Sequence, residues 1–218
     1  MKNILLNTIY IIIVSGLFCL SLSVNGEQIP ENHQALAIPY ELITESHQSN
    51  IIVSGDSIII RAKKGTDLYT NSSGSSTTDN APRIFFKPKA DFSLSAKLTA
   101  NFTSAYDGGA LYVYSDSNNW AKLLFERFKS GDNGIASTVT KNFGDDVYHN
   151  LIINNEIYFK IVRKENTFIF YYSINGEEWL YRRSFNLSSQ EPIKVGFITQ
   201  APLSKTHQVE YSNIVFNE

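Results

Sequence analysis

Short runs of β-branched and aromatic residues follow one another along this chain, with turn residues between them, and this pattern limits the possible fold more than any other feature. Between residues 91 and 102, apolar side chains such as Phe92, Leu94 and Leu98 alternate with polar ones. This alternation has the period of a strand with one buried and one solvated face. No stretch shows a long helical period. The sequence predicts an all-β domain, a two-sheet antiparallel sandwich or jelly roll of about a dozen strands.

Turn signals divide the chain into hairpins. The β-branched runs 51–53 and 57–61 flank Ser54-Gly55-Asp56, and Asn175-Gly176 is the strongest short hairpin signal in the sequence. We expect Trp179, which follows that turn, to be a packing anchor. Residues 71–80 are predicted to be a polar loop, solvated or lying as a flap over a site, and residues 141–148 to be a loop carrying Asp145-Asp146.

The amino-terminal segment has the features of a secretory signal. Lys2 is followed by a largely apolar stretch from residue 4 to 22, and small or compact residues precede Glu27. We therefore predict a signal peptide at 1–26, a linker or irregular lead-in strand at 27–50, and one sandwich domain at 51–218. An uncleaved amino-terminal anchor is the alternative. Cys19, the only cysteine, lies within the predicted signal, which excludes disulfides and thiol chemistry in the mature chain.

Composition narrows the possible partners. The formal charge is -2 for 218 residues, so there is no basic surface of the kind that nucleic-acid binding requires. The predicted location is secreted or extracellular, or periplasmic in a bacterium, with no membrane association after signal removal. Three tripeptides fit the acceptor pattern for N-glycosylation, at Asn71, Asn101 and Asn186.

Several motifs resemble one known family across nearly the whole predicted domain. They are Gly65–Leu68, Ala81–Phe85, Asp91–Leu94, Asn119–Lys122 with Glu126, Val195–Phe197 and Gln200–Pro202. In order and spacing they resemble the concanavalin A-like domain family of uncertain function that is named after a regulator of enolase. The resemblance implies a jelly-roll sandwich of lectin and glucanase type. It does not imply lectin or glucanase activity.

The stretch from 119 to 128 carries the most informative chemistry. As a strand, it places Trp120, Lys122, Leu124 and Glu126 on one face, which is unusually polar for a core element. Lys122 and Glu126 are roughly 13 Å apart along a strand, so each needs a partner from a neighbouring strand. Of Asp145 and Asp146, only one is expected to reach the same face. We predict that this polar face is the floor of a binding groove.

A sugar ligand needs fixed hydrogen-bonding groups for its hydroxyls and an aromatic surface for its ring. The polar candidates are Lys122, Glu126, Asp145, Asp146, Lys160 and Gln200. The aromatic candidates are Tyr112, Tyr114, Trp120 and Tyr172. The four histidines lack metal-binding spacing, and no cofactor motif is present. We therefore predict neither a metal site nor a cofactor.

Three hypotheses follow. The first is a secreted, non-catalytic module that binds carbohydrate over the face of Trp120, Lys122 and Glu126. The second is a protein-interaction or structural domain whose buried polar residues only stabilise the fold. The third is a weak glycoside hydrolase that uses Glu126, although the strand offers one carboxylate where retaining chemistry needs two about 5 Å apart.

Overall fold

A computed structural model describes residues 27–28, 36–187 and 192–218 of the chain. The predicted signal peptide, residues 1–26, lies outside the described residues, as does most of the segment before residue 36. Within the described part no α-helix is present, and therefore none that is long and apolar enough to cross a membrane.

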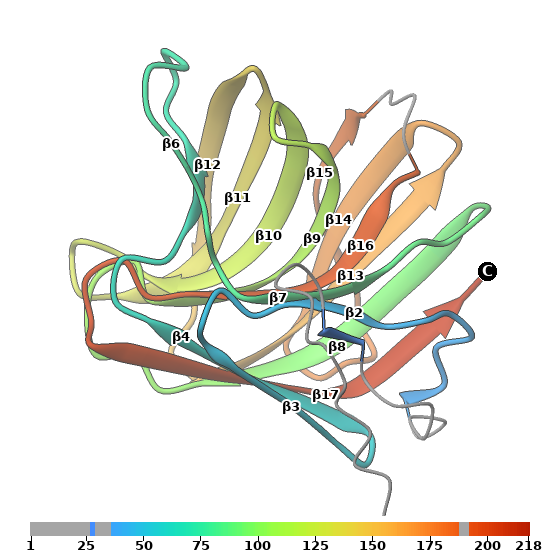
Figure 1. Ribbon diagram of the computed structural model, residues 1–218, viewed down its shortest axis with the longest axis horizontal. Coiled ribbons are helices and arrows are strands. Elements are labelled where there is room, and N and C mark those ends of the chain that lie inside the picture. The colour runs from blue at the N-terminus through green and yellow to red at the C-terminus, as the bar shows by residue number, and fades with distance from the viewer. Residues whose placement is uncertain (1–26, 29–35, 188–191) are drawn as a thin grey trace, which may run out of the picture.

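Two large sheets form a sandwich (Figure 1). The eight-stranded sheet contains, in spatial order, β1 (Glu27–Gln28), β2 (Ile43–Glu45), β7 (Arg83–Phe86), β16 (Lys194–Gln200), β9 (Gly108–Asp116), β10 (Asn119–Arg127), β11 (Asn133–Lys141) and β12 (Phe143–Leu151). The seven-stranded sheet contains β15 (Leu180–Asn186), β14 (Thr167–Ser173), β13 (Glu156–Lys164), β8 (Phe92–Ala100), β17 (Thr206–Asn217), β4 (Ser57–Lys63) and β3 (Asn50–Ser54). Neighbouring strands in both sheets are antiparallel.

The main core lies between the two sheets. In β8 every second side chain from Phe92 to Ala100 is buried and the residues between are half-buried, so the predicted alternation is confirmed. From the eight-stranded sheet, Ala121, Leu123 and Phe125 of β10 enter the same core. The all-β sandwich predicted from the sequence is the fold of the chain.

A second, smaller apolar cluster lies on the other face of the eight-stranded sheet. Trp120 and Leu124 of β10 meet Tyr112 of β9 there, and the crossing segment 66–82 covers them with Leu68 and Ala81. This segment contains a short hairpin of β5 (Leu68–Thr70) and β6 (Thr77–Asp79). Because both faces of the sheet are covered here, β10 is buried almost continuously.

The β5–β6 hairpin rises beside β12 at one edge of the molecule (Figure 1). The Gly144 amide donates to the Asn71 carbonyl at 3.1 Å, and a Cβ at Gly144 would lie 1.8 Å from the Thr70 carbonyl oxygen. This close approach requires glycine at position 144. It fixes the hairpin as a wall standing over the outer face of the sheet.

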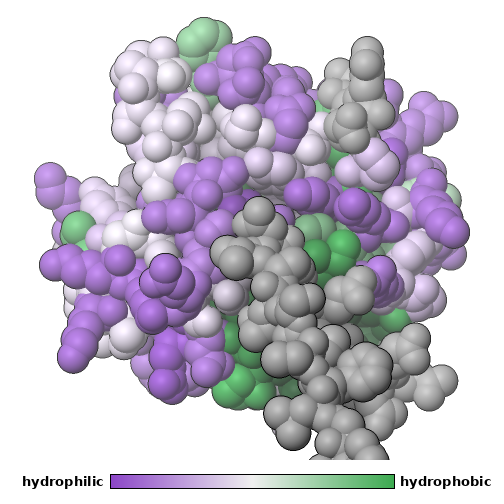
Figure 2. All heavy atoms as spheres, viewed as in Figure 1, coloured by the Kyte–Doolittle hydropathy of each residue, from purple (hydrophilic) through white to green (hydrophobic). Residues whose placement is uncertain are grey.

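Strands occupy most of one predicted loop and a short part of the other. The polar stretch 71–80 includes β6, and 141–148 lies mostly in β12, because backbone pairing with β5 and β11 outweighs the turn-like composition of both segments. The 27–50 segment also contributes to the sandwich: Leu36 and Leu42 are in the core, and β2 pairs with β7. The visible face of the molecule is mostly hydrophilic, with small apolar areas (Figure 2).

Candidate functional site

A pocket of about 400 Å³ opens on the outer face of the eight-stranded sheet, beneath the β5–β6 hairpin. Its floor comes from alternate residues of neighbouring strands, Lys122, Leu124 and Glu126 of β10 with Ala136 and Thr138 of β11. Its walls are Asp67, Tyr69, Tyr106, Asp146, Tyr148 and Gln200. The volume lies near the lower end of the roughly 300–1,000 Å³ typical of ligand pockets.

Lys122 is fully engaged by the protein. Its Nζ lies 2.6 Å from the Leu68 carbonyl oxygen, 2.8 Å from Gln200 Oε1 and 3.4 Å from Asp67 Oδ1. An ammonium group has three protons to donate, and these acceptors use all of them. The acidic partner of Lys122 comes from the crossing segment, as Asp67, and not from a neighbouring strand of the sheet as predicted. Lys122 therefore joins the crossing segment to the sheet.

Glu126 has the opposite character. Its side chain is 4% exposed, and the described residues offer its carboxyl group no hydrogen bond or ion pair. Its cross-strand neighbours are Gly108 on β9 and Gly134 on β11, neither of which has a side chain to reach it. A Cβ at Gly108 would lie 2.8 Å from Leu124 Cδ1 and 3.1 Å from Glu126 Cβ, so the site requires glycine there.

The environment holds the pKa of Glu126 at about 7. Burial is the main cause, since desolvation disfavours the charged form. The Lys122 ammonium opposes this effect, and the carboxyl groups of Asp67 and Asp146 add to it. Near neutral pH the protonated and the ionised forms of Glu126 are thus both populated. In one state it donates a hydrogen bond, and in the other it only accepts.

Three tyrosines supply the aromatic surface of the pocket. Tyr148 is 60% exposed, and its ring packs against Phe128 at a tilt of 35°, with 4.5 Å between centroids. Tyr69 is 37% exposed, and Tyr106 is half-buried. Burial, followed by nearby acidic groups, raises the pKa of both Tyr69 and Tyr148, which indicates that the rings and the carboxyl groups share one space.

Four of the sequence-predicted residues come together in this pocket: Lys122, Glu126, Asp146 and Gln200. Asp146 accepts a hydrogen bond from the Thr138 hydroxyl group. As expected from the alternation of a strand, only one of the two aspartates reaches the pocket. Asp145 faces the other way, is 65% exposed, and pairs with Arg183 of β15 at 2.9 Å.

The predicted aromatic surface needs correction. Trp120 and Tyr112 are on the predicted face but are buried beneath the crossing segment, where Trp120 supports Lys122 at 5.9 Å from its ring centroid. Tyr114 is nearby, and its hydroxyl donates to Asp79. Tyr172 and Lys160 belong to the seven-stranded sheet and do not reach the pocket. Lys160 lies over the Trp179 ring at 3.7 Å.

Sequence reasoning missed Asp67, Tyr69, Tyr106 and Tyr148. Asp67 and Tyr69 come from the crossing segment, and Tyr148 from β12, which was expected to be a loop. Strand alternation in β12 places Asp146 and Tyr148 on the same face, so this pair could have been predicted from the sequence. The positions of Asp67 and Tyr69 in the pocket are set by how the crossing segment packs on the sheet, which the sequence does not indicate.

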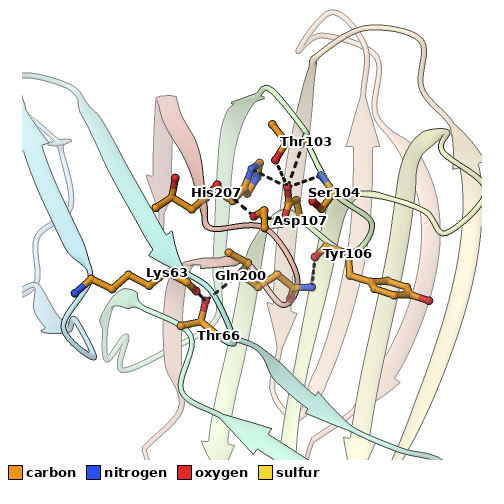
Figure 3. A network of polar contacts seen from close by, with 11 residues as sticks. Lys63, Thr66, Thr103, Ser104, Tyr106, Asp107, Gln200 and His207 are labelled. Carbon is orange, nitrogen blue, oxygen red and sulfur yellow. Dashed lines mark hydrogen bonds and ion pairs between the residues drawn. The ribbon is translucent and has the colours of Figure 1, made fainter.

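A buried polar network next to the pocket positions Tyr106 (Figure 3). Asp107 Oδ2 accepts hydrogen bonds from the Thr103 amide, the Thr103 hydroxyl and the Ser104 amide, and its Oδ1 accepts one from the Ser204 hydroxyl at 2.6 Å. The neighbouring Tyr106 carbonyl accepts from Gln200 Nε2 at 3.0 Å, while the Tyr106 ring extends away from Asp107 (Figure 3). Gln200 thereby links this network to Lys122.

The three predicted glycosylation sites occupy different surroundings. Asn71 forms the turn of the β5–β6 hairpin, where its side chain bonds Ser75 and the Ser76 amide. Asn101 is exposed and accepts a hydrogen bond from Asn155. Asn186 is exposed at the end of β15, and its tripeptide ends outside the described residues. In the part of the chain that the structure describes, no group of three or more acidic, histidine or cysteine side chains is arranged to hold a metal ion.

The fold and site define the class of this protein, an antiparallel β-sandwich with a pocket on the outer face of one sheet. The chain belongs to the family described as "protein of unknown function" (DUF1349), whose model matches residues 44–218. The more specific family name suggested by the sequence motifs stays a prediction. No functionally curated protein sequence matches the chain.

Solved structures share the fold. A functionally unknown protein from Saccharomyces cerevisiae has a TM-score of 0.74 at 15% identity, covering 80% of this chain and 94% of that one. A xylan β-1,4-xylosidase from Bacillus halodurans has a TM-score of 0.57 at 13% identity, covering 80% of this chain but 39% of that one. The Bacteroides ovatus xyloglucan protein GH43B gives 0.59 at 13% identity, with coverages of 80% and 38%. In the latter two, this chain matches less than half of a longer protein.

Proposed function

We propose that this protein is a non-catalytic carbohydrate-binding module whose ligand occupies the pocket between the β5–β6 hairpin and the outer face of the eight-stranded sheet. One observation carries the proposal: the exposed rings of Tyr69 and Tyr148 line the same pocket as Glu126, a buried carboxyl group that forms no hydrogen bond or ion pair with the described residues. A pyranose ring presents an apolar face and a rim of hydroxyls, which suits aromatic rings beside fixed polar groups.

The residues in this proposal differ from those that the sequence suggested. Tyr148, Tyr69 and Tyr106 replace Trp120 as the aromatic surface. Glu126 and Asp146 face the ligand, whereas Lys122 and Gln200 hold the pocket together. The names of the structurally similar proteins mention xylan and xyloglucan, and those words guide only the choice of test sugars.

Calorimetry against a panel of oligosaccharides tests the proposal, with xylo-, gluco- and amino-sugar series included. We expect the wild-type protein to bind at least one series. Tyr148→Ala should weaken that binding by about tenfold, the scale of one aromatic contact. Asp145→Asn is the matched control, since its side chain points away from the pocket. Absence of binding to every series, or equal affinity in Tyr148→Ala, would contradict the proposal.

A glycoside hydrolase is the second candidate, because a carboxyl group with a pKa of about 7 shares a pocket with a second carboxyl group, Asp146. A raised pKa suits a general acid at neutral pH. Release of reducing sugar from the bound series, lost in Glu126→Gln, would favour this candidate over the binding module.

We also propose that the protein is secreted, with the signal-like residues 1–26 as the motivation. Amino-terminal sequencing of the exported protein should begin at or near Glu27. A membrane-bound chain that retains residue 1 would instead support an anchor.

A further inference from the structure

We infer that the pocket selects saccharides with a free, positively charged amino group, such as a hexosamine unit without its acetyl group. The inference rests on the proposed carbohydrate-binding function and specifies its ligand. It follows from which groups of the pocket remain available after the protein has formed its own contacts.

Among the described residues that line the pocket, the one ammonium group cannot serve a ligand. Lys122 donates its three protons to the Leu68 carbonyl, Gln200 and Asp67, and its side chain is buried. Gln200 is held at both ends, since its oxygen accepts from Lys122 and its nitrogen donates to the Tyr106 carbonyl. The groups left for a ligand are carboxyl oxygens and tyrosine hydroxyls.

The charges of the pocket are unequal. Three carboxyl groups, Asp67, Glu126 and Asp146, line it together with one ammonium, and Asp67 is the group that pairs with that ammonium. Glu126 and Asp146 have no cationic partner among the described residues. A ligand that brings one positive charge offsets this excess, whereas a neutral sugar leaves it in place.

The burial of Glu126 is an independent sign of a missing partner. The side chain is more than nine-tenths buried, forms no hydrogen bond with the described residues and lines the cavity, so its carboxyl oxygens face the space that a ligand would fill. The residues opposite it on both neighbouring strands, Gly108 and Gly134, have no side chain that could donate to it. An ammonium group has three donors and a full charge, so it fits this acceptor better than a single hydroxyl does.

The tyrosines favour the same ligand. The faces of aromatic rings attract cations, and the effect grows where water is excluded. Tyr69, Tyr106 and Tyr148 line the cavity with the carboxyl groups. Rings and carboxylates together are the usual chemistry of an amine site, and the absence of a three-ligand cluster among the described residues argues against a metal ion as the cation.

Binding of an amine should release a proton from Glu126. The titratable groups that face Glu126 are Lys122 on its own strand, Asp67 and Tyr69 from the crossing segment, Tyr106 before β9, and Asp146 and Tyr148 on β12. Burial and the two aspartates hold the pKa of Glu126 at about 7 in the empty pocket. A bound cation favours the ionised form, so at pH 6 the group changes from mostly protonated to ionised.

Three β-1,4-linked tetrasaccharides that differ only at carbon 2 test the inference: glucosamine, N-acetylglucosamine and glucose oligomers. Calorimetry near pH 6, where the amines carry their protons, should show the glucosamine oligomer binding at least about tenfold tighter than the other two, the scale of one charge-assisted contact. Equal affinity across the series overturns the amine inference but leaves carbohydrate binding intact. Binding of none of them, together with none of the wider panel, overturns both.

The variant Glu126→Gln separates charge from shape. It should remove the preference for the glucosamine oligomer, and the proton release measured in buffers of different ionisation enthalpy should disappear. Asp145→Asn makes the same chemical change one residue from the pocket-lining Asp146 and should alter neither. A preference that survives in Glu126→Gln, or wild-type binding without proton release, overturns the assignment of Glu126 as the amine acceptor.

Discussion

Asp107, which directly precedes β9, and Glu126 of the neighbouring strand β10 are two buried carboxyl groups, and the protein treats them in opposite ways. Asp107 is fully buried and accepts four hydrogen bonds from Thr103, Ser104 and Ser204. Glu126, opposite the residue that follows Asp107, is almost as buried and accepts none from the described residues. A buried carboxyl with a full set of donors serves the fold, whereas one without donors costs stability and is available for a ligand.

The largest effect should come from removing the satisfied member of the pair. Asp107→Ala leaves two backbone amides and two hydroxyls without their acceptor, so we expect the free energy of unfolding to fall by about 3–5 kcal/mol. Urea denaturation measures this loss. The same change at the exposed Asp145 should cost less than about 1 kcal/mol. A loss at Asp107 as small as at Asp145 would end the distinction between the two carboxyl groups.

Glu126→Gln should have the opposite sign. The pKa of Glu126 is raised in the folded state, so its contribution to stability is present at low pH and is lost as the pH rises through about 7. At pH 8 the wild-type protein therefore keeps a buried charge that the glutamine variant lacks. We expect the variant to be more stable at pH 8 by on the order of 2 kcal/mol, and this difference to shrink towards pH 5.

Thermal unfolding of both proteins at pH 5 and pH 8 checks the expectation. A glutamine variant that is less stable than the wild type at pH 8 would show that Glu126 has a stabilising partner, and that the two carboxyl groups are alike.

His207, which lies beside Asp107, should give the opposite pH dependence of stability to Glu126. It is buried, stacks on Phe102 at 5.4 Å and has Nδ1 3.9 Å from Asp107 Oδ2. Burial lowers its pKa to about 4, and the nearby Asp107 opposes that shift. Between about pH 6.5 and pH 4 the His207 imidazole is therefore protonated in the unfolded chain but neutral in the folded chain. The free energy of unfolding falls with decreasing pH across this window.

His207→Gln should reduce the loss of unfolding free energy between pH 6.5 and pH 4 by about 1–2 kcal/mol, with some loss of packing at every pH. Denaturation midpoints between pH 4 and pH 7 measure the slope. An unchanged slope would mean that another group causes the acid sensitivity.

Much of this arrangement was predictable, and the reason for the rest is physical. A period of two residues identifies which side chains of β10 share a face, so Lys122 and Glu126 were found from the sequence. The same period says nothing about what covers that face. Trp120 was therefore taken for an exposed ring, although Leu68 and Ala81 of a distant segment cover it. Likewise, alternation showed that only one of Asp145 and Asp146 reaches the pocket, but the choice depends on the register of β12 with β11, where Asp146 pairs with Thr138.

That register provides the finest comparison, between two adjacent aspartates. Asp145→Asn removes an exposed ion pair with Arg183 and should change stability by less than about 1 kcal/mol, with no effect on ligand affinity.

Asp146→Asn keeps an acceptor for Thr138 but removes a charge from the pocket. We expect it to lower the pKa of Glu126, because one of the negative charges that raise it is gone. The titration of Glu126, followed by carboxyl-carbon NMR, should thus move to lower pH in Asp146→Asn and stay in place in Asp145→Asn. Equal titration in the two variants would show that the charge of Asp146 does not act on Glu126.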